Sequence, residues 1–377
     1  MSDRITRTYA AMAEPAIMEA HVKDGMVKTQ TDAYFDLARD KGEHVDDLAR
    51  RFHGRRIERV FIGATQRNTG FTIPGVEVAW LDKSVFVEAA HGSIDHLVAA
   101  FAGALVLMTN NDVGRPEASP GYRRLVAACE DTIFLAWDMD NHHWVEASTM
   151  LAGVSDMYFP AHNQNMWMLS RFNWLTCGPV PCATNQWSRQ ELADSLHAML
   201  AIERSDEPLG QHMCYSPFTF RNQVAITMHL SYDRVGFNDG DFHKKSSQER
   251  LAEWMSHKVH WIIPALNDVP NRIFDALISG GIPIVPESLR YLVPVSDIPA
   301  EHIVFYSPMD IVTPKKIVEA AVVRFDAAGQ DGIAARARYA LEHHHGDLRM
   351  RRIFALAQDR FGFQPLPWLQ SISPLDK

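Results

Sequence analysis

The sequence contains no long apolar run, and no stretch approaches the ~18 residues that a membrane-spanning helix needs. Its first residues, MSDRITRTYAAMAEPAIMEA, also lack the uninterrupted apolar segment of a secretory signal. We therefore expect a cytoplasmic protein without a transmembrane segment.

Cysteine is scarce, with four residues in a chain of 377. Cys177 and Cys182 lie close together, but no two further ligands that a zinc site would need lie near them in the sequence. We expect the four cysteines to be free thiols in a reducing compartment, and the pattern predicts no metal held by them.

Positive charge is also in deficit, because 37 Lys and Arg residues face 46 Asp and Glu residues and give a formal net charge of -9. Such a balance disfavours a surface built to hold nucleic acid or anionic lipid. The glycine fingerprint of dinucleotide-binding folds is missing as well, so no dinucleotide cofactor is predicted.

The most informative stretch that is present runs from Lys258 to Glu287 and reads as strand, polar loop, helix, tight turn and strand. The apolar run 259–263 is typical of a buried parallel strand. Gly280 and Gly281 end the helix, because glycine adopts the left-handed backbone at low cost. The run 282–285 is the next buried strand.

Ligands of doubly wound sheets bind at the carboxyl ends of the strands, which is where this polar loop is expected. Asn267, Asn271 and Arg272 are therefore candidates, and the guanidinium beside a helix N-terminus suits a phosphate group. Asp275, one turn into the helix, is a candidate for ribose hydroxyls, and Glu287 follows the next strand. An ordinary βαβ unit with a solvated loop is the alternative.

A second polar cluster follows the predicted strand 132–137 and comprises Asp138, Asp140, Asn141, His142 and His143. Carboxylates and imidazoles at a strand end are the groups that acid/base chemistry uses. The same residues offer oxygen and nitrogen donors to a divalent cation, and they also suit a helix-capping cluster. We expect Asp138, His142 and His143 to be catalytic, with His91 behind them, and we assign no metal.

The segment RIFDALISGGIPI (272–284) resembles the donor-site segment of glycosyltransferases with the two-domain GT-B fold, and in particular the spore-coat-type, family 1-like C-terminal domain. The segments HIVFYSPMDIVTPKKIVEAAV (302–322) and ALEHHHGDLRMRRIF (340–354) continue the similarity, which covers about residues 206–360. The chain departs from the family at Asp275, where Glu is usual.

The resemblance implies an α/β fold of two Rossmann-like domains facing across a cleft. The corresponding domains are a helical N-terminal extension (1–54), an acceptor domain (55–205), a nucleotide-sugar-binding domain (206–360) and a tail that crosses back (361–377). It also implies that Ser216 and Arg221 face the nucleotide phosphates. The full donor set is then Ser216, Arg221, Asn267, Asn271, Arg272, Asp275 and Glu287.

The activity implied by the resemblance is metal-independent transfer of a sugar from a nucleotide-sugar donor to a glycan or small-molecule hydroxyl, as in polysaccharide biosynthesis. Three alternatives stay open: a non-catalytic nucleotide-sugar-binding or scaffold protein, a DNA-base glucosyltransferase and a nucleotide-sugar epimerase. The donor sugar, the base, the acceptor, the stereochemical outcome and a homodimer are likewise left open by the sequence.

Overall fold

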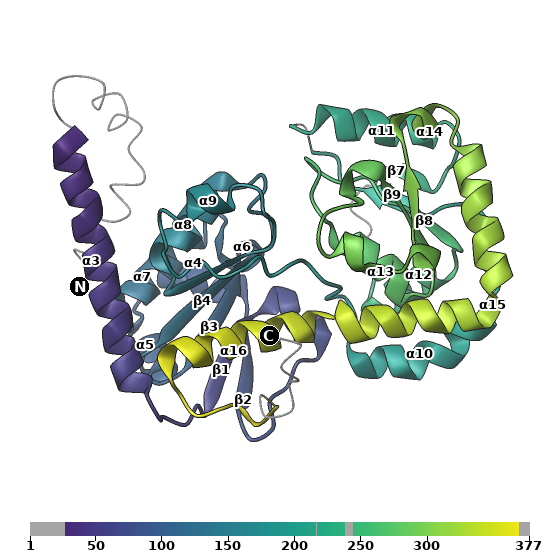
Figure 1. Ribbon diagram of the computed structural model, residues 1–377. Coiled ribbons are helices and arrows are strands. Elements are labelled where there is room, and N and C mark those ends of the chain that lie inside the picture. The colour runs from purple at the N-terminus through teal and green to yellow at the C-terminus, as the bar shows by residue number, and fades with distance from the viewer. Residues whose placement is uncertain (1–26, 216, 238–243, 369–377) are drawn as a thin grey trace. The chain divides into compact units, whose positions relative to one another are not determined.

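The computed structural model describes residues 27–215, 217–237 and 244–368, and the structural statements below concern these residues. The chain divides into two compact units (Figure 1). Of the described residues, those within 27–67, 71–180 and 350–368 form the first unit, and those within 68–70 and 181–349 form the second. Each unit is described by itself.

The first unit contains a five-stranded parallel sheet in the order β2-β1-β3-β4-β5 (Figure 1). Its elements are α3 (Val27–Phe52), β1 (Arg59–Gly63), the 3-10 helix η1 (Ala64–Thr69), β2 (Glu77–Leu81), α4 (Lys83–Ala89), α5 (Asp95–Phe101), β3 (Leu105–Thr109), α6 (Asn110–Val113), α7 (Ser119–Ala128), β4 (Ile133–Asp138), α8 (Val145–Val154), β5 (Met157–Pro160) and α9 (Met166–Leu169).

The three central strands of this sheet are apolar without alternation, because both of their faces are covered. Phe61 and Phe134 pack on one face with Phe86, Phe101 and Tyr122 from the helices α4, α5 and α7. The residues that alternate with them point to the other face and are equally buried: Val60, Ile62, Leu105, Leu107 and Leu135. Burial on both faces is what a doubly wound parallel sheet requires.

Two segments distant in sequence complete the first unit. The predicted N-terminal helix is present as α3, and its residues Leu48 and Phe52 are fully buried. At the other end of the chain, Trp368 packs edge-on against Phe71, with ring centroids 6.1 Å apart, and Phe71 in turn stacks on Phe354 of α16 (Gly346–Phe361). Residues 350–368 thus belong to the first unit.

The second unit is also α/β, and all of its strand pairs are parallel. Its elements are α10 (Arg189–Ala201), β6 (Gly210–His212), α11 (Thr219–His229), β7 (Val235–Phe237), α12 (Ser247–Met255), β8 (Val259–Trp261), α13 (Asn271–Ile278), β9 (Ile282–Pro286), three short 3-10 turns η3 (Glu287–Leu289), η4 (Val295–Asp297) and η5 (Ala300–His302), β10 (Val304–Tyr306), α14 (Pro308–Val312) and α15 (Lys315–His343), which is broken at Gly329.

The strand pair β7-β6 and the sheet β8-β9-β10 are joined where Leu209, just before β6, bridges to His260 of β8. The Leu209 backbone donates to the Val259 carbonyl over 3.1 Å and accepts from the Trp261 N–H over 2.8 Å. Gly210 permits this approach, because a Cβ there would lie 2.8 Å from the Trp261 carbonyl oxygen. The resulting order, β7-β6-β8-β9-β10, repeats that of the first unit.

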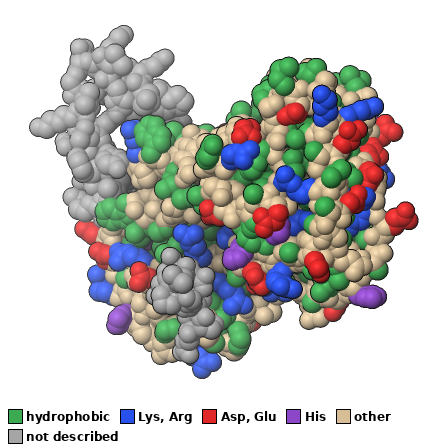
Figure 2. Space-filling view, turned by 45° about the vertical axis from the view of Figure 1, so that its right-hand side comes forward, with side chains coloured by type: hydrophobic (Ala, Val, Ile, Leu, Met, Phe, Trp, Pro, Cys, Tyr) green, Lys and Arg blue, Asp and Glu red, His purple; other side chains and the backbone are tan. Residues whose placement is uncertain are grey.

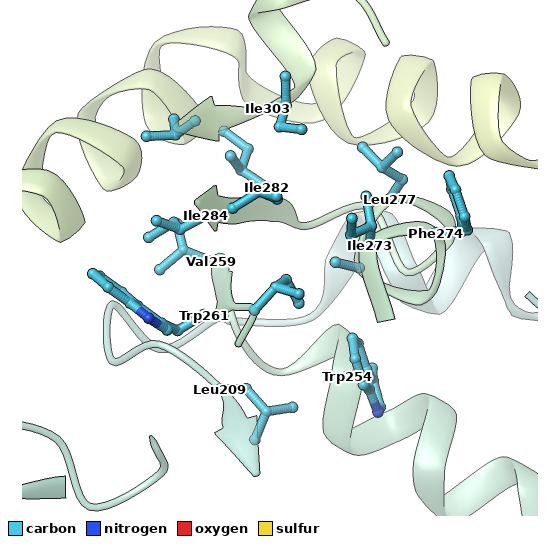
Figure 3. Close-up of a cluster of buried hydrophobic side chains, with 14 of the residues drawn as sticks. Leu209, Trp254, Val259, Trp261, Ile273, Phe274, Leu277, Ile282, Ile284 and Ile303 are labelled. Carbon is cyan, nitrogen blue, oxygen red and sulfur yellow. The ribbon is translucent and has the colours of Figure 1, made fainter. Parts of the chain in front are cut away.

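The core of the second unit lies between its strands and α13 (Figure 3). Ile273, Phe274 and Leu277 of α13 are fully buried, and Trp261 and Ile284 project from the neighbouring strands β8 and β9 into the same cluster. The apolar helix face and the two apolar runs of the sequence therefore meet, as predicted. The structure confirms two Rossmann-like α/β units with an N-terminal helix.

The boundary between the units differs from the expected one at residues 205 and 206. Helix α10 lies before that point, yet it belongs to the second unit, because Leu192 and Met199 enter the core that contains β8, β9 and α13. The second boundary falls inside α16, between Arg349 and Met350, and not at residue 361. A helix that starts in one unit and ends in the other carries no composition signal of a boundary.

The surface carries charged side chains of both signs. Lys and Arg side chains are interspersed with Asp and Glu side chains over the face shown in Figure 2. Among the described residues, no helix combines the length and the apolar character that crossing a bilayer demands.

Candidate functional site

Both sheets have a topological switch point, at which consecutive connections leave in opposite directions. In the second unit this point lies between β6 and β8, so the loops that follow His212 and Trp261 flank it. Ligands of such sheets bind beyond the carboxyl ends of the strands at this place. Predicted donor residues from both loops are found here.

Arg272 lies in the first turn of α13 and is half-buried. Its Nη1 donates to Nδ1 of His212, over 2.6 Å. Burial first, and the charges of Arg272 and Arg221 next, hold the pKa of His212 well below its usual range. Burial and Arg221 lower the pKa of Arg272 to about 10, so the guanidinium is charged at neutral pH.

Arg221, two residues into α11, is 6% exposed and spans the switch point. Its Nη1 donates to the Met213 carbonyl at 2.5 Å, after β6, and its Nε donates to the Ile263 carbonyl at 3.4 Å, after β8. No carboxylate among the described residues lies within ion-pair distance of Arg221 or Arg272. Two positive charges thus lie at one strand edge with no carboxylate in ion-pair contact among the described residues, and the charge of Asp268 acts on both from a greater distance.

The helices that carry these arginines begin without side-chain caps. Phe218 precedes α11 and Pro270 precedes α13, and neither residue has a side chain that can accept from the first backbone N–H groups. Uncapped N–H groups and the helix dipole favour an anion at such an end. The Oδ1 atom of Asn271, the first residue of α13, is buried and has no hydrogen-bond partner in the described part of the chain.

A pocket of about 540 Å³ opens beside Arg221. Its walls are mainly apolar and come from the loops after β6, β8, β9 and β10, and its lining includes Pro217, Phe218, Phe220, Ile263, Leu266, Tyr306 and Ile311. Asn267 and Glu287 contribute polar groups to it. This size and lining are usual for a small-molecule site with a flat ring and a few polar atoms.

The remaining predicted donor residues differ in their environments. Asn267 is exposed, has a φ of 62°, and its Oδ1 accepts from Ser288 Oγ. Glu287 is exposed and pairs with Arg290, which lowers the pKa of the Glu287 carboxyl. Ser216 lies outside the described residues.

Asp275 is fully buried, and its Oδ2 accepts from Gln186 Nε2 at 2.7 Å. Burial raises the pKa of its carboxyl to about 6, and the hydrogen bonds it accepts oppose that rise. Its Oδ1 has no partner among the described residues. This carboxylate therefore lies inside the unit, and its contact with a ribose stays a prediction.

In the first unit, Asp138 ends β4 and is fully buried. Its carboxylate accepts from Tyr158 Oη at 2.6 Å and from the Asp140 backbone N–H at 3.1 Å. Burial raises the pKa of Asp138 to about 6, helped by the nearby charge of Asp140. A carboxyl with this pKa exchanges a proton near neutral pH.

His142 and His143 lie in the turn that follows, and the structure brings a third imidazole, His162, to them. The nitrogens His142 Nε2 and His143 Nδ1 are 2.7 Å apart, and the ring of His162 meets that of His142 edge-on at 4.5 Å. Burial lowers the pKa of His162 to about 4 and holds that of His142 far below its usual range, so both are neutral at pH 7.

Two asparagines fix this turn, and the sequence did not mark them as more than polar residues at strand ends. Asn110, after β3, accepts from the Met139 N–H at 2.9 Å and donates to Asp140 Oδ2 at 2.5 Å. Asn141 donates to the His162 and Gln164 carbonyls and accepts from the His162 N–H. The loops after β3, β4 and β5 are thereby held together.

His91 is not brought to the cluster. It follows α4, which begins directly after β2 and runs back toward the amino ends of the strands, so His91 lies at the opposite edge of the sheet. The loop after β1 forms η1, in which Thr65 is bound to Asp112 and Arg67 pairs with Asp82.

His212 was missed in the sequence because it lies within an apparent strand, and a lone histidine there usually packs in the core. Its position as the last residue of β6 is the only signal that could have singled it out.

The chain matches no protein-family model and no curated protein sequence. Its structure is similar to that of the sucrose-phosphate synthase from Thermosynechococcus elongatus, with a TM-score of 0.45 and 11% sequence identity over 81% of this chain and 99% of that chain.

Proposed function

We propose that this protein is a glycosyltransferase that binds the pyrophosphate of a nucleotide-sugar donor at the switch point of its second unit. The observation that carries the proposal is the pair Arg221 and Arg272, two guanidiniums that form no ion pair with a carboxylate of the described residues, each at the start of an uncapped helix. Leaving-group charge in sugar transfer is stabilised by such groups.

The apolar pocket beside Arg221 supports a nucleotide as the ligand. A base has two flat apolar faces, and Phe218 and Phe220 among the lining residues offer surfaces on which it can stack. Asn267 and Glu287 then offer hydrogen-bonding groups to the base or the sugar. With guanidiniums and helix N-termini at the phosphates, the donor needs no cation in this proposal.

The acceptor, a glycan or small-molecule hydroxyl, is assigned to the first unit, with Asp138, His142 or His143 as the base. General-base catalysis contributes about 10²- to 10⁴-fold to rate. Asp138→Asn and His143→Gln are expected to lower kcat within that range while leaving donor affinity unchanged. If a variant retains the kcat of the parent protein, the substituted residue is not the catalytic base.

A thermal-shift screen with uridine, guanosine, adenosine and cytidine nucleotide sugars tests the donor. One of them is expected to raise Tm in proportion to its concentration, since ligands that bind only the native state stabilise it. The same ligand with Arg272→Ala is expected to give no shift. If no nucleotide sugar moves Tm, the proposal fails.

A non-catalytic nucleotide-sugar-binding protein is the second candidate, favoured by the full burial of Asp275, whose Oδ2 accepts from Gln186. It predicts the same Tm shift but neither donor hydrolysis nor transfer over long incubation. DNA as the acceptor is disfavoured by the net charge of -9.

A further inference from the structure

Asp140, His142 and His143 each present one metal-ligating atom, and these three atoms all lie within 4.8 Å of one another. We propose that they form a binding site for Zn²⁺ at the carboxyl edge of the first sheet. The inference goes beyond the proposed function. It uses no residue of the donor site, but it takes His142 and His143 as ligands and so leaves Asp138 as the base of the acceptor site.

The turn that carries the three ligands is rigid before any ion arrives. The backbone N–H groups of His143 and Trp144 both donate to the Asp140 carbonyl, at 3.1 and 3.0 Å. The side-chain oxygen of Asn110, which follows β3, accepts from the Met139 N–H. Asn165 Nδ2 donates to the His142 carbonyl at 3.2 Å. A site whose backbone is already fixed loses little conformational entropy on binding.

The donor set selects the class of metal. Two imidazole nitrogens and one carboxylate oxygen suit Zn²⁺, whereas Mg²⁺ and Ca²⁺ prefer oxygen ligands throughout. Two nitrogens at 2.0–2.1 Å from a tetrahedral ion lie about 3.3 Å apart. The 2.7 Å between His142 Nε2 and His143 Nδ1 therefore requires only a small rotation of the rings.

The groups around the ligands resemble the outer shell that metal sites need. Asn110 Nδ2 donates to Asp140 Oδ2 at 2.5 Å, which orients the carboxylate toward the imidazoles. His162 Nε2 is hydrogen-bonded to the Met139 carbonyl at 2.9 Å. We therefore treat this imidazole as part of the wall of the site and not as a ligand. Three protein ligands leave a fourth position for water or a substrate oxygen, as in catalytic zinc sites.

Cobalt and zinc titrations of the full chain, after treatment with a chelator, test the site. One equivalent of Co²⁺ is expected to bind and to give visible d–d absorption, and Zn²⁺ is expected to displace it and abolish the absorption. His143→Ala and Asp140→Asn are each expected to remove the signal. His96→Ala, which removes an exposed histidine on α5, is the matched control and is expected to retain it.

Asp140→Asn preserves an oxygen that can accept from Asn110. This variant therefore tests the metal site even if His143→Ala does not fold. The proposal is overturned if no equivalent of Co²⁺ binds, or if both variants bind it with parental affinity. In the latter case the ion lies elsewhere, for instance at the exposed thiol of Cys214. Arg272→Ala is expected to retain the signal, which separates this site from the donor proposal.

Discussion

Arg272 donates a hydrogen bond to the buried nitrogen Nδ1 of His212, over 2.6 Å, so a cation is held by an imidazole and not by a carboxylate. A carboxylate at that place would neutralise the guanidinium. The neutral imidazole orients it and leaves its charge for an anionic ligand. His212 therefore positions the charged side chain of Arg272.

Arg272→Ala and Arg272→Lys are both expected to weaken nucleotide binding. Hydrogen bonds to charged groups contribute about 1.5–3 kcal/mol, which corresponds to roughly 10- to 100-fold in Kd. Lysine restores the charge but not the forked geometry, so only part of the affinity should return. Calorimetric titration with the nucleotide found in the Tm screen measures both values. Arg338→Ala, on the exposed side of α15, is the control and should bind as the parent does.

Acid should destabilise the protein through its buried histidines. Burial holds the pKa values of His212, His260 and His344 well below the ordinary value. A group with a depressed folded-state pKa stabilises the native state above its unfolded pKa, about 6.5, and this stabilisation is lost as the pH falls. Urea unfolding between about pH 7 and pH 5 should show falling stability.

His260 provides the single-site test of this acid effect, since it is fully buried and its ring stacks on Trp254 at 4.7 Å. His260→Leu removes one titrating group from the core and is expected to reduce the slope of stability against pH. An unchanged slope would mean that His260 binds its proton equally in the folded and unfolded states.

Asp138 should act in the opposite direction. Its pKa rises from 3.8 to about 6 on folding, because burial penalises the charged form. Its stabilising contribution is therefore present below the unfolded pKa and is lost as the pH rises through about 6. Relative to Asp138→Asn, the parent should lose at most roughly 3 kcal/mol of stability between about pH 4 and pH 7. Paired urea titrations give this difference, and a constant difference would contradict the assignment.

Gly63→Ala tests the loops at the switch point of the first unit. A Cβ at Gly63 would lie 1.9 Å from Asp112 Oδ2, which accepts from the Thr65 and Thr109 hydroxyls. Overpacking of this kind costs about 1–3 kcal/mol, and displacing the carboxylate adds to that cost. Thermal unfolding should show a clear fall in Tm. Gly92→Ala, whose Cβ would lie 3.2 Å from the Glu88 carbonyl, is expected to lower Tm far less.

The sequence predicted most elements of both sheets, because fully apolar runs such as 133–137 and 282–285 have few alternatives to a buried strand. It did not predict that α10 packs on the second core, since the placement of Leu192 and Met199 depends on tertiary contacts. A helix capping box at Ser188 marks where α10 begins but not which core it joins.

The site was predictable in residue types but not in arrangement. Polar residues after β4 were visible, yet the convergence of His162 on His142 depends on the neighbouring strand β5 and on Asn141, which ties the two loops. Arg221 was expected to face phosphate, and its hydrogen bonds to the Met213 and Ile263 carbonyls follow from the β6–β8 bridge, which has no local signature.

The repeated strand order also bears on how this chain can be altered. The same backbone plan supports imidazoles and carboxylates at one strand edge and guanidiniums at the other, while the cores beneath them share no residues. Selection or engineering can therefore rewrite the side chains of one edge without disturbing the packing of the other, so that each half of the molecule is open to independent change.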